Sequence, residues 1–182
     1  MNIDDADLLY DLLISRRVLS LAVVDRSQRP VIGMVPFVAE ADLGSALVHV
    51  SRLAPHGKAM TSGTAFAALI QAPDDIELQP GQIPRVRFNG RAESLDRGTV
   101  AHTAARSSYL KRFPDSEETF GLGDFELYRL RFESGRLVAG VALTVNLKPP
   151  IQGPGATQRA TRPAPWAGCG RTTPPQSGPS LV

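Results

Sequence analysis

Short runs of alternating hydrophobic and polar residues fill most of the first 147 positions of the chain. Seven of these runs are rich in Val, Ile, Leu, Phe or Ala, which is typical of β-strands. They cover residues 18–25, 30–38, 45–51, 65–71, 83–95, 125–133 and 136–145. Short turns join most of the neighbouring runs, and this spacing favours an antiparallel sheet over a parallel one.

The fifth run has the clearest two-sided pattern. Val86 and Phe88 alternate with Arg85, Arg87 and Asn89, which predicts a long strand with one polar face in solvent. The pattern alone is equally typical of an ordinary exposed strand and of a strand that presents arginines to a ligand.

Turn residues separate the last two runs. Ser134 and Gly135 lie between 125–133 and 136–145, and a small residue followed by Gly is typical of a tight turn. The sequence therefore predicts a closing β-hairpin with its turn at these two positions.

Helical periodicity occurs in 5–15 and 96–113, and a shorter helix is predicted between the third and fourth strands, where Pro55 opens it. The apolar stripes are Leu8, Leu9, Leu12 and Leu13 in the first segment, and Ala101, Ala104, Ala105 and Tyr109 in the second. About seven strands with two or three short helices predict a mainly β, α+β fold built on an antiparallel barrel, and not a doubly wound sheet.

The composition changes at Lys148. Residues 148–182 hold eight of the fifteen prolines and four basic residues but no Asp or Glu, so we expect a disordered, Pro/Gly-rich basic tail after a single domain at 1–147. Because these four charges exceed the formal net charge of +2, the domain itself has a net charge of −2. It has no dense basic face, so we expect no nucleic-acid partner.

Cysteine content and apolar run length bear on where the protein works. Cys169 is the single cysteine, which excludes an intrachain disulfide framework. The acidic start MNIDDAD is unlike a secretory signal, and no apolar run approaches the roughly 18 residues of a membrane span. We therefore expect a cytoplasmic protein without a membrane partner.

One loop carries the strongest chemical signal. The three histidines, His49, His56 and His102, lack the spacing of metal ligands, and neither a phosphate-binding glycine loop nor a nucleophile motif is present. A polar cluster directly follows the third strand. It consists of Ser51, Arg52, His56 and Lys58. A hydroxyl, an imidazole and two cationic groups at a strand end form a plausible phosphate-binding loop, although a solvated loop would have the same composition.

Four segments, in order, resemble one known family. They are RPVIGMVPF, VHVSRLAPHGKAM, RVRFNGRAESL and YLKRFPDSEETFGLGDFELYRLRF, within about residues 6–147. Together they are similar to the pyridoxamine 5'-phosphate-oxidase-like FMN-binding split barrels. The second and fourth segments look particularly like the branch of that family that includes heme-utilisation relatives.

The resemblance implies a split β-barrel of the FMN-binding type and a homodimer with its flavin sites at the subunit interface. Met34, Val35 and Pro36 would line the isoalloxazine ring, mostly through backbone groups, although barrel packing explains these residues equally well. The loop cluster would hold the phosphate of FMN. Arg85, and with less support Arg87, would contact the flavin bound to the second subunit. The implied function is an FMN-dependent oxidoreductase with a small-molecule substrate, in which no side chain stands out as a general acid or base.

The sequence also departs from the family. Nothing after Val145 matches the Trp- and Arg-containing C-terminal segment of the pyridoxine-biosynthetic oxidases, and no histidine follows His102 to ligate heme. Both departures argue against pyridoxamine-phosphate oxidation and heme breakdown. A non-catalytic flavin- or heme-binding module, and a split-barrel reductase that uses the deazaflavin F420, remain as alternative functions.

Overall fold

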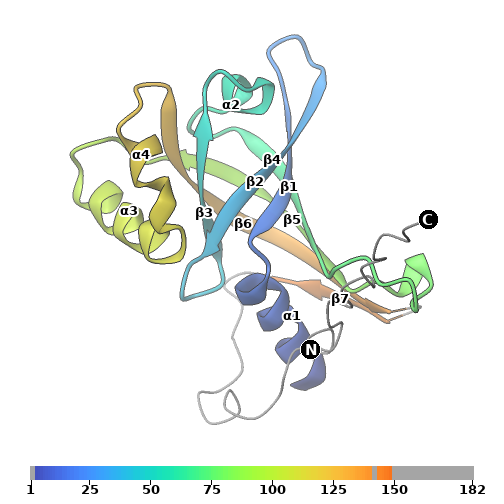
Figure 1. The fold of residues 1–182 in the computed structure, drawn as a ribbon. Coiled ribbons are helices and arrows are strands. Elements are labelled where there is room, and N and C mark those ends of the chain that lie inside the picture. Colours follow the sequence, from blue (N-terminus) through green and yellow to red (C-terminus); the bar gives the residue numbers. More distant parts are fainter. Residues whose placement is uncertain (1–2, 141–142, 149–182) are drawn as a thin grey trace, which may run out of the picture.

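Seven antiparallel strands form one sheet that closes into a barrel (Figure 1). The computed structural model describes residues 3–140 and 143–148. The strands are β1 (Val18–Val24), β2 (Pro30–Ala39), β3 (Ser45–Ser51), β4 (Ala65–Gln71), β5 (Arg85–Ser94), β6 (Phe125–Gly140) and β7 (Leu143–Leu147). The helices are α1 (Ile3–Ser15), α2 (Pro55–Ala59), α3 (Val100–Arg112) and α4 (Glu117–Phe120), with single 3-10 turns at Pro80–Gln82 and Pro114–Ser116.

The strand order is β3-β2-β1-β4-β5-β6-β7, and β3 also pairs with β6. This second pairing joins the two ends of a six-stranded barrel, while β7 extends the far half of β6 outside the closed ring. The predicted antiparallel barrel is therefore confirmed. In the described part of the chain, no helix is long and apolar enough to cross a membrane.

Alternating side chains fill the barrel, as the strand pattern predicts. Phe37 and Phe88 are fully buried inside it, and Phe88 stacks on Phe132 with ring centroids 4.0 Å apart. From α1, Leu9, Leu12 and Leu13 complete this core. Figure 1 shows α1 at one end of the barrel and α2 at the other, so each helix covers one opening.

A second, smaller core lies outside the barrel, between β3 and the helices α3 and α4 (Figure 1). Leu47 and Leu127 point outward from their strands and pack there with Tyr109 and Phe120. Strand β3 is consequently buried on both faces. The predicted helical stripe is correct for Ala105 and Tyr109, whereas Ala101 and Ala104 are exposed.

The predicted turn at Ser134 and Gly135 is wrong. Strand β6 continues through both residues to Gly140, and the chain reverses only after that point. Gly135 lies opposite Phe88, and a Cβ on it would come within 2.7 Å of the Phe88 ring. The glycine is therefore required by close packing inside a strand and not by a turn. The predicted tail, 148–182, lies outside the described residues except for Lys148.

Replacing this glycine tests the packing argument. Gly135→Ala forces a methyl group into the Phe88 ring, and we expect a loss of about 1–3 kcal/mol in the free energy of unfolding by urea. Gly81→Ala is the matched control, because a Cβ there has nothing within 4 Å and its backbone is not strained. Equal stability of the two variants would show that Gly135 is not a packing glycine.

Candidate functional site

One edge of β2 is open, because its two neighbours cover it unequally. Strand β1 pairs with β2 from Pro30 to Pro36, whereas β3 pairs with it only from Phe37 to Ala39. The Phe37 N–H donates to the carbonyl of Arg17 on the β1 side. Since hydrogen-bonding directions alternate along an antiparallel strand, the N–H and C=O of Met34 point the other way, toward the open edge.

The outer face of the same strand is apolar and exposed. Ile32 and Met34 are 71% and 73% exposed, and Pro36 continues the row. Val35 points inward, is only 3% exposed, and turns its N–H and C=O toward Leu19 on β1, so of the predicted Met34–Val35–Pro36 set only Met34 and Pro36 face a ligand. Large apolar side chains this exposed on a barrel strand are typical of a surface that binds a ligand or another subunit.

Helix α2 packs against β1 and β2 at one end of the barrel and separates two of the predicted phosphate-binding residues. His56 points into the barrel opening, where its ring occupies the space that a Cβ on Gly33 would take, 2.3 Å from the imidazole Nδ1. Burial lowers the pKa of this imidazole. Lys58 is two residues further on, which turns it about 200° around the helix, and it is exposed. Within the described chain its ammonium has no ion pair.

The other two residues of the predicted loop, Ser51 and Arg52, face acidic residues at the start of β6. The Ser51 hydroxyl donates to Oδ2 of Asp124 at 2.6 Å and accepts from the backbone N–H of Leu53 at 3.1 Å. Arg52 pairs with Glu126 at 3.2 Å and donates to the carbonyl of Gly123 at 2.9 Å. Of the four predicted residues, only Lys58 is thus both exposed and without an ion pair or a side-chain hydrogen bond to another described residue. Asp124 and Glu126 were not identified as site residues from the sequence.

Arg85 and Arg87 lie on β5, but their side chains have different environments. Arg85 donates to the carbonyl of Ile83 at 2.9 Å and helps hold the loop before the strand. Arg87 points outward, next to Leu69 on β4. Three strand steps, roughly 14 Å along the sheet, separate Arg87 from Met34. Within one protomer Arg87 is therefore not adjacent to the β2 strip.

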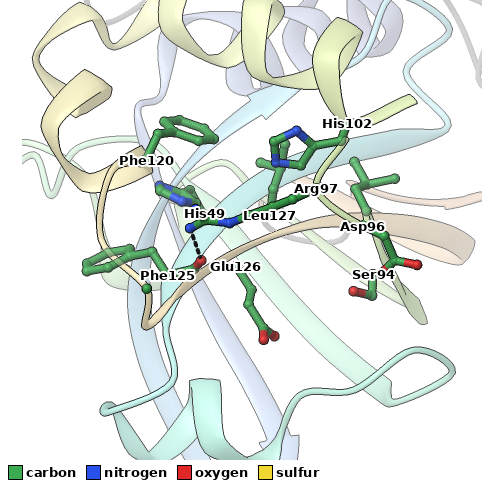
Figure 2. Close-up of a pocket in the computed structure, with 11 residues that line it drawn as sticks. His49, Ser94, Asp96, Arg97, His102, Phe120, Phe125, Glu126 and Leu127 are labelled. Atoms are coloured by element: carbon green, nitrogen blue, oxygen red, sulfur yellow. Dashed lines mark hydrogen bonds between the residues drawn. The ribbon is translucent and has the colours of Figure 1, made fainter. Parts of the chain in front are cut away.

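A cavity of about 260 Å³ lies between the end of β5, the start of β6 and the helices α3 and α4 (Figure 2). His49 lines it and stacks on Phe120, with ring centroids 3.8 Å apart and planes 8° from parallel. Arg97 donates to the carbonyls of Leu122 and Phe125 and borders the same space, as does His102. No local sequence pattern links these residues, because only the folding of α3 and α4 over β3 brings them together.

The charge state of His49 follows from this packing. Burial, and then the positive charge of Arg97 and the neighbouring His102, lower the pKa of His49 to about 4. Its Nδ1 lies 3.3 Å from the Thr119 hydroxyl, which already donates to the Ser116 carbonyl. Nδ1 is therefore the protonated nitrogen of a neutral ring. No three His, Cys, Asp or Glu side chains in the described residues lie close enough to hold a metal ion.

A second cavity, of about 340 Å³, opens at the Pro36 end of the β2 strip. Arg17 and Arg112 lie over the Phe113 ring, at 5.7 and 5.8 Å from its centroid. Arg112 donates to the carbonyls of Ile14 and Arg16, yet its buried Nε has no partner. Arg17, Arg112 and Asp115 all line this cavity, so two positive charges face one negative charge and the lining suits a small anion.

Neither a protein-family model nor a curated protein matches the sequence. Solved structures do match the fold. A heme-binding protein from Mycobacterium smegmatis matches with a TM-score of 0.69 and 22% identity over 81% of this chain and 59% of that one. A Clostridium acetobutylicum protein related to general stress protein 26, of the pyridoxinephosphate oxidase family, matches with a TM-score of 0.60 and 9% identity over 82% and 97%.

A FAD-binding protein from Mesorhizobium loti has a TM-score of 0.54 and 15% identity, over 71% of this chain and 92% of that one. The resemblance noted in the sequence is confirmed at the level of the fold: the chain has the split barrel shared by these proteins. This chain spans less than two thirds of the Mycobacterium smegmatis protein.

The neutral state of His49 predicts an acid sensitivity. The unfolded chain binds a proton at this residue near pH 6.5, whereas the folded chain does so only near pH 4, so stability is lost as the pH falls through this window. We expect His49→Gln to flatten the fall in urea midpoint between pH 7 and pH 5. Thr119→Val, which removes the hydrogen-bond partner but keeps the imidazole, serves as control and should retain the slope. An unchanged slope in His49→Gln would contradict the assignment.

Proposed function

We propose that the protein is an FMN-binding flavoprotein, an FMN-dependent oxidoreductase with a small anionic substrate, and that it works as a homodimer with its flavin sites at the subunit interface. The observation that carries the proposal is the apolar, exposed strip of β2, Ile32 to Pro36, beside an open backbone edge. Such a strip offers a flat ring both an apolar surface and free backbone hydrogen-bonding groups.

The residues around the strip fit a flavin phosphate in part. Lys58 is an exposed ammonium on α2, a helix that packs against β2, and we assign the phosphate to it. Ser51 contributes to the phosphate site indirectly, because its hydrogen bond to Asp124 fixes the loop that leads into α2. His56 closes the barrel opening behind Gly33, on the inner face of β2, and therefore lies behind the strip. The residues 1–147 are the flavin-binding domain in this proposal, and 148–182 are an appended tail.

The opposite end of the strip suits the substrate. Gly33 and Pro36 are three residues apart, roughly 10 Å in an extended strand, and the cavity with Arg17 and Arg112 lies at the Pro36 end. A ring system along β2 would thus have Lys58 near one end and two guanidinium groups near the other. The bound flavin supplies hydride chemistry, while these side chains orient cofactor and substrate.

Flavin binding is the first test. The purified protein should show the two flavin absorption bands on adding FMN, and Lys58→Ala should weaken FMN binding about tenfold to a hundredfold through loss of a charged hydrogen bond. Riboflavin, which lacks the phosphate, should bind both proteins equally. Lys111→Ala on α3, also an exposed lysine, is the matched control. No flavin uptake by the unmodified protein would overturn the proposal.

A non-catalytic heme-binding module is the second candidate, since the Mycobacterium smegmatis protein with this fold binds heme. A Soret band on titration with hemin, without flavin uptake, would favour it. Flavin uptake followed by reduction with a nicotinamide donor or with a substrate would favour the oxidoreductase.

The dimer is tested separately. Aspartates at Ile32 and Met34 place charge on the exposed strip, and we expect the double variant Ile32→Asp/Met34→Asp to sediment as a monomer while the unmodified protein sediments as a dimer. Val100→Asp on α3 is the control, because Val100 is an apolar residue that is 87% exposed and is not part of the β2 strip. A monomeric unmodified protein would remove the homodimer from the proposal.

A further inference from the structure

Six arginines lie on β5 and β6, and four of them have partners. Arg85 donates to backbone carbonyls, and Arg129 pairs with Glu40 at 2.6 Å. Arg91 pairs with Glu133, and Arg131 pairs with Glu93. The remaining two, Arg87 and Arg136, make no hydrogen bond or ion pair with any residue that the structure describes.

Arg87 and Arg136 lie directly opposite each other in the β5–β6 ladder, and both side chains are exposed on the outer face. Like charges directly opposite in a sheet repel, because their Cβ atoms are only about 4.5–5.5 Å apart. A sequence that places two arginines in this way without an acidic neighbour has a local electrostatic cost that a bound anion would remove.

The same two strands carry an internal comparison. Arg91 and Arg131 are also directly opposite each other, but each is compensated. Arg91 pairs with Glu133 at 3.5 Å, and Arg131 pairs with Glu93 at 2.6 Å. One arginine pair on this surface is therefore neutralised by protein carboxylates, whereas the other is left positive.

The surroundings of the uncompensated pair are polar on one side and apolar on the other. Asn146 on β7 is opposite Arg136, and Asn89 and Ser134 form the next β5–β6 pair on the same face; all three are exposed. On the other side Leu69 of β4 is opposite Arg87. The residues opposite one another across the sheet form a transverse row of Met34, Ser20, Leu69, Arg87 and Arg136, which passes from the apolar strip of β2 to the arginine pair. The amide and hydroxyl groups beside the pair can add hydrogen bonds to an oxyanion.

We propose that Arg87 and Arg136 together form an oxyanion site that binds the phosphate group of a ligand lying on this outer face. Two guanidinium forks can each donate two parallel N–H groups to phosphate oxygens, a geometry that lysines could not reproduce. The inference rests on the proposed function in placing a phosphorylated ligand here. The phosphate could belong to the flavin held by the second subunit or to a separate phosphorylated substrate, and the chemistry of recognition is the same.

The pair is tested first without any flavin. Inorganic pyrophosphate should raise the melting temperature of the unmodified protein and of Arg91→Gln/Arg131→Gln, which removes the same charge from the same strands. It should stabilise Arg87→Gln/Arg136→Gln much less, with an apparent affinity at least about tenfold weaker. Without pyrophosphate, Arg87→Gln/Arg136→Gln should melt no lower than the unmodified protein, because repulsion is removed. Equal stabilisation of the two double variants would overturn the site.

FMN and riboflavin then distinguish the two sources of the phosphate. Weaker binding of FMN but not of riboflavin by Arg87→Gln/Arg136→Gln would assign the site to the flavin phosphate. Unchanged FMN binding, with loss of the pyrophosphate effect on the flavin-loaded protein, would assign it to a phosphorylated substrate. If the unmodified protein binds no flavin, the proposed function fails, while the pyrophosphate experiment still decides whether the arginine pair binds phosphate.

Discussion

Strand β3 determines where the barrel closes and where it stays open. It pairs with β6 along its whole length but with β2 over only three residues, Ala46 to Val48. It cannot move to cover the rest of β2, because its outward residues Leu47 and His49 are buried beneath α3 and α4. The small outer core therefore maintains the open edge of β2, although it lies on a different side of the strand from the proposed ligand.

The outer face of the sheet has an uneven charge distribution because of a β-bulge between β5 and β6. Around the bulge at Asn89 and Gly90, one residue of β6 has no direct partner on β5, and Glu133 is the residue left over. Its carboxylate pairs with Arg91 on the near side of the bulge. Beyond the bulge the ladder supplies no acid, and Arg87 and Arg136 remain positive.

Local patterns predicted the strands well and the assembly of the site poorly. The strands at 45–51 and 65–71 match their predicted bounds, because each is bordered by turn residues. The turn at Gly135 was predicted wrongly, since a packing glycine and a turn glycine look alike in a sequence. Ser51 and Asp124 are 73 positions apart, so no local pattern could show that the hydroxyl is committed to that carboxylate.

The transverse row from Met34 to Arg136 also bears on why a second copy of the chain would matter. These residues are four strand steps apart, roughly 19 Å along a curved sheet, with Ser20 and Leu69 between them. Curvature turns the two ends of the row away from each other, so one compact ligand cannot easily contact both on one protomer. A ligand that contacts both the β2 strip and an arginine pair would therefore need the second subunit of the proposed homodimer.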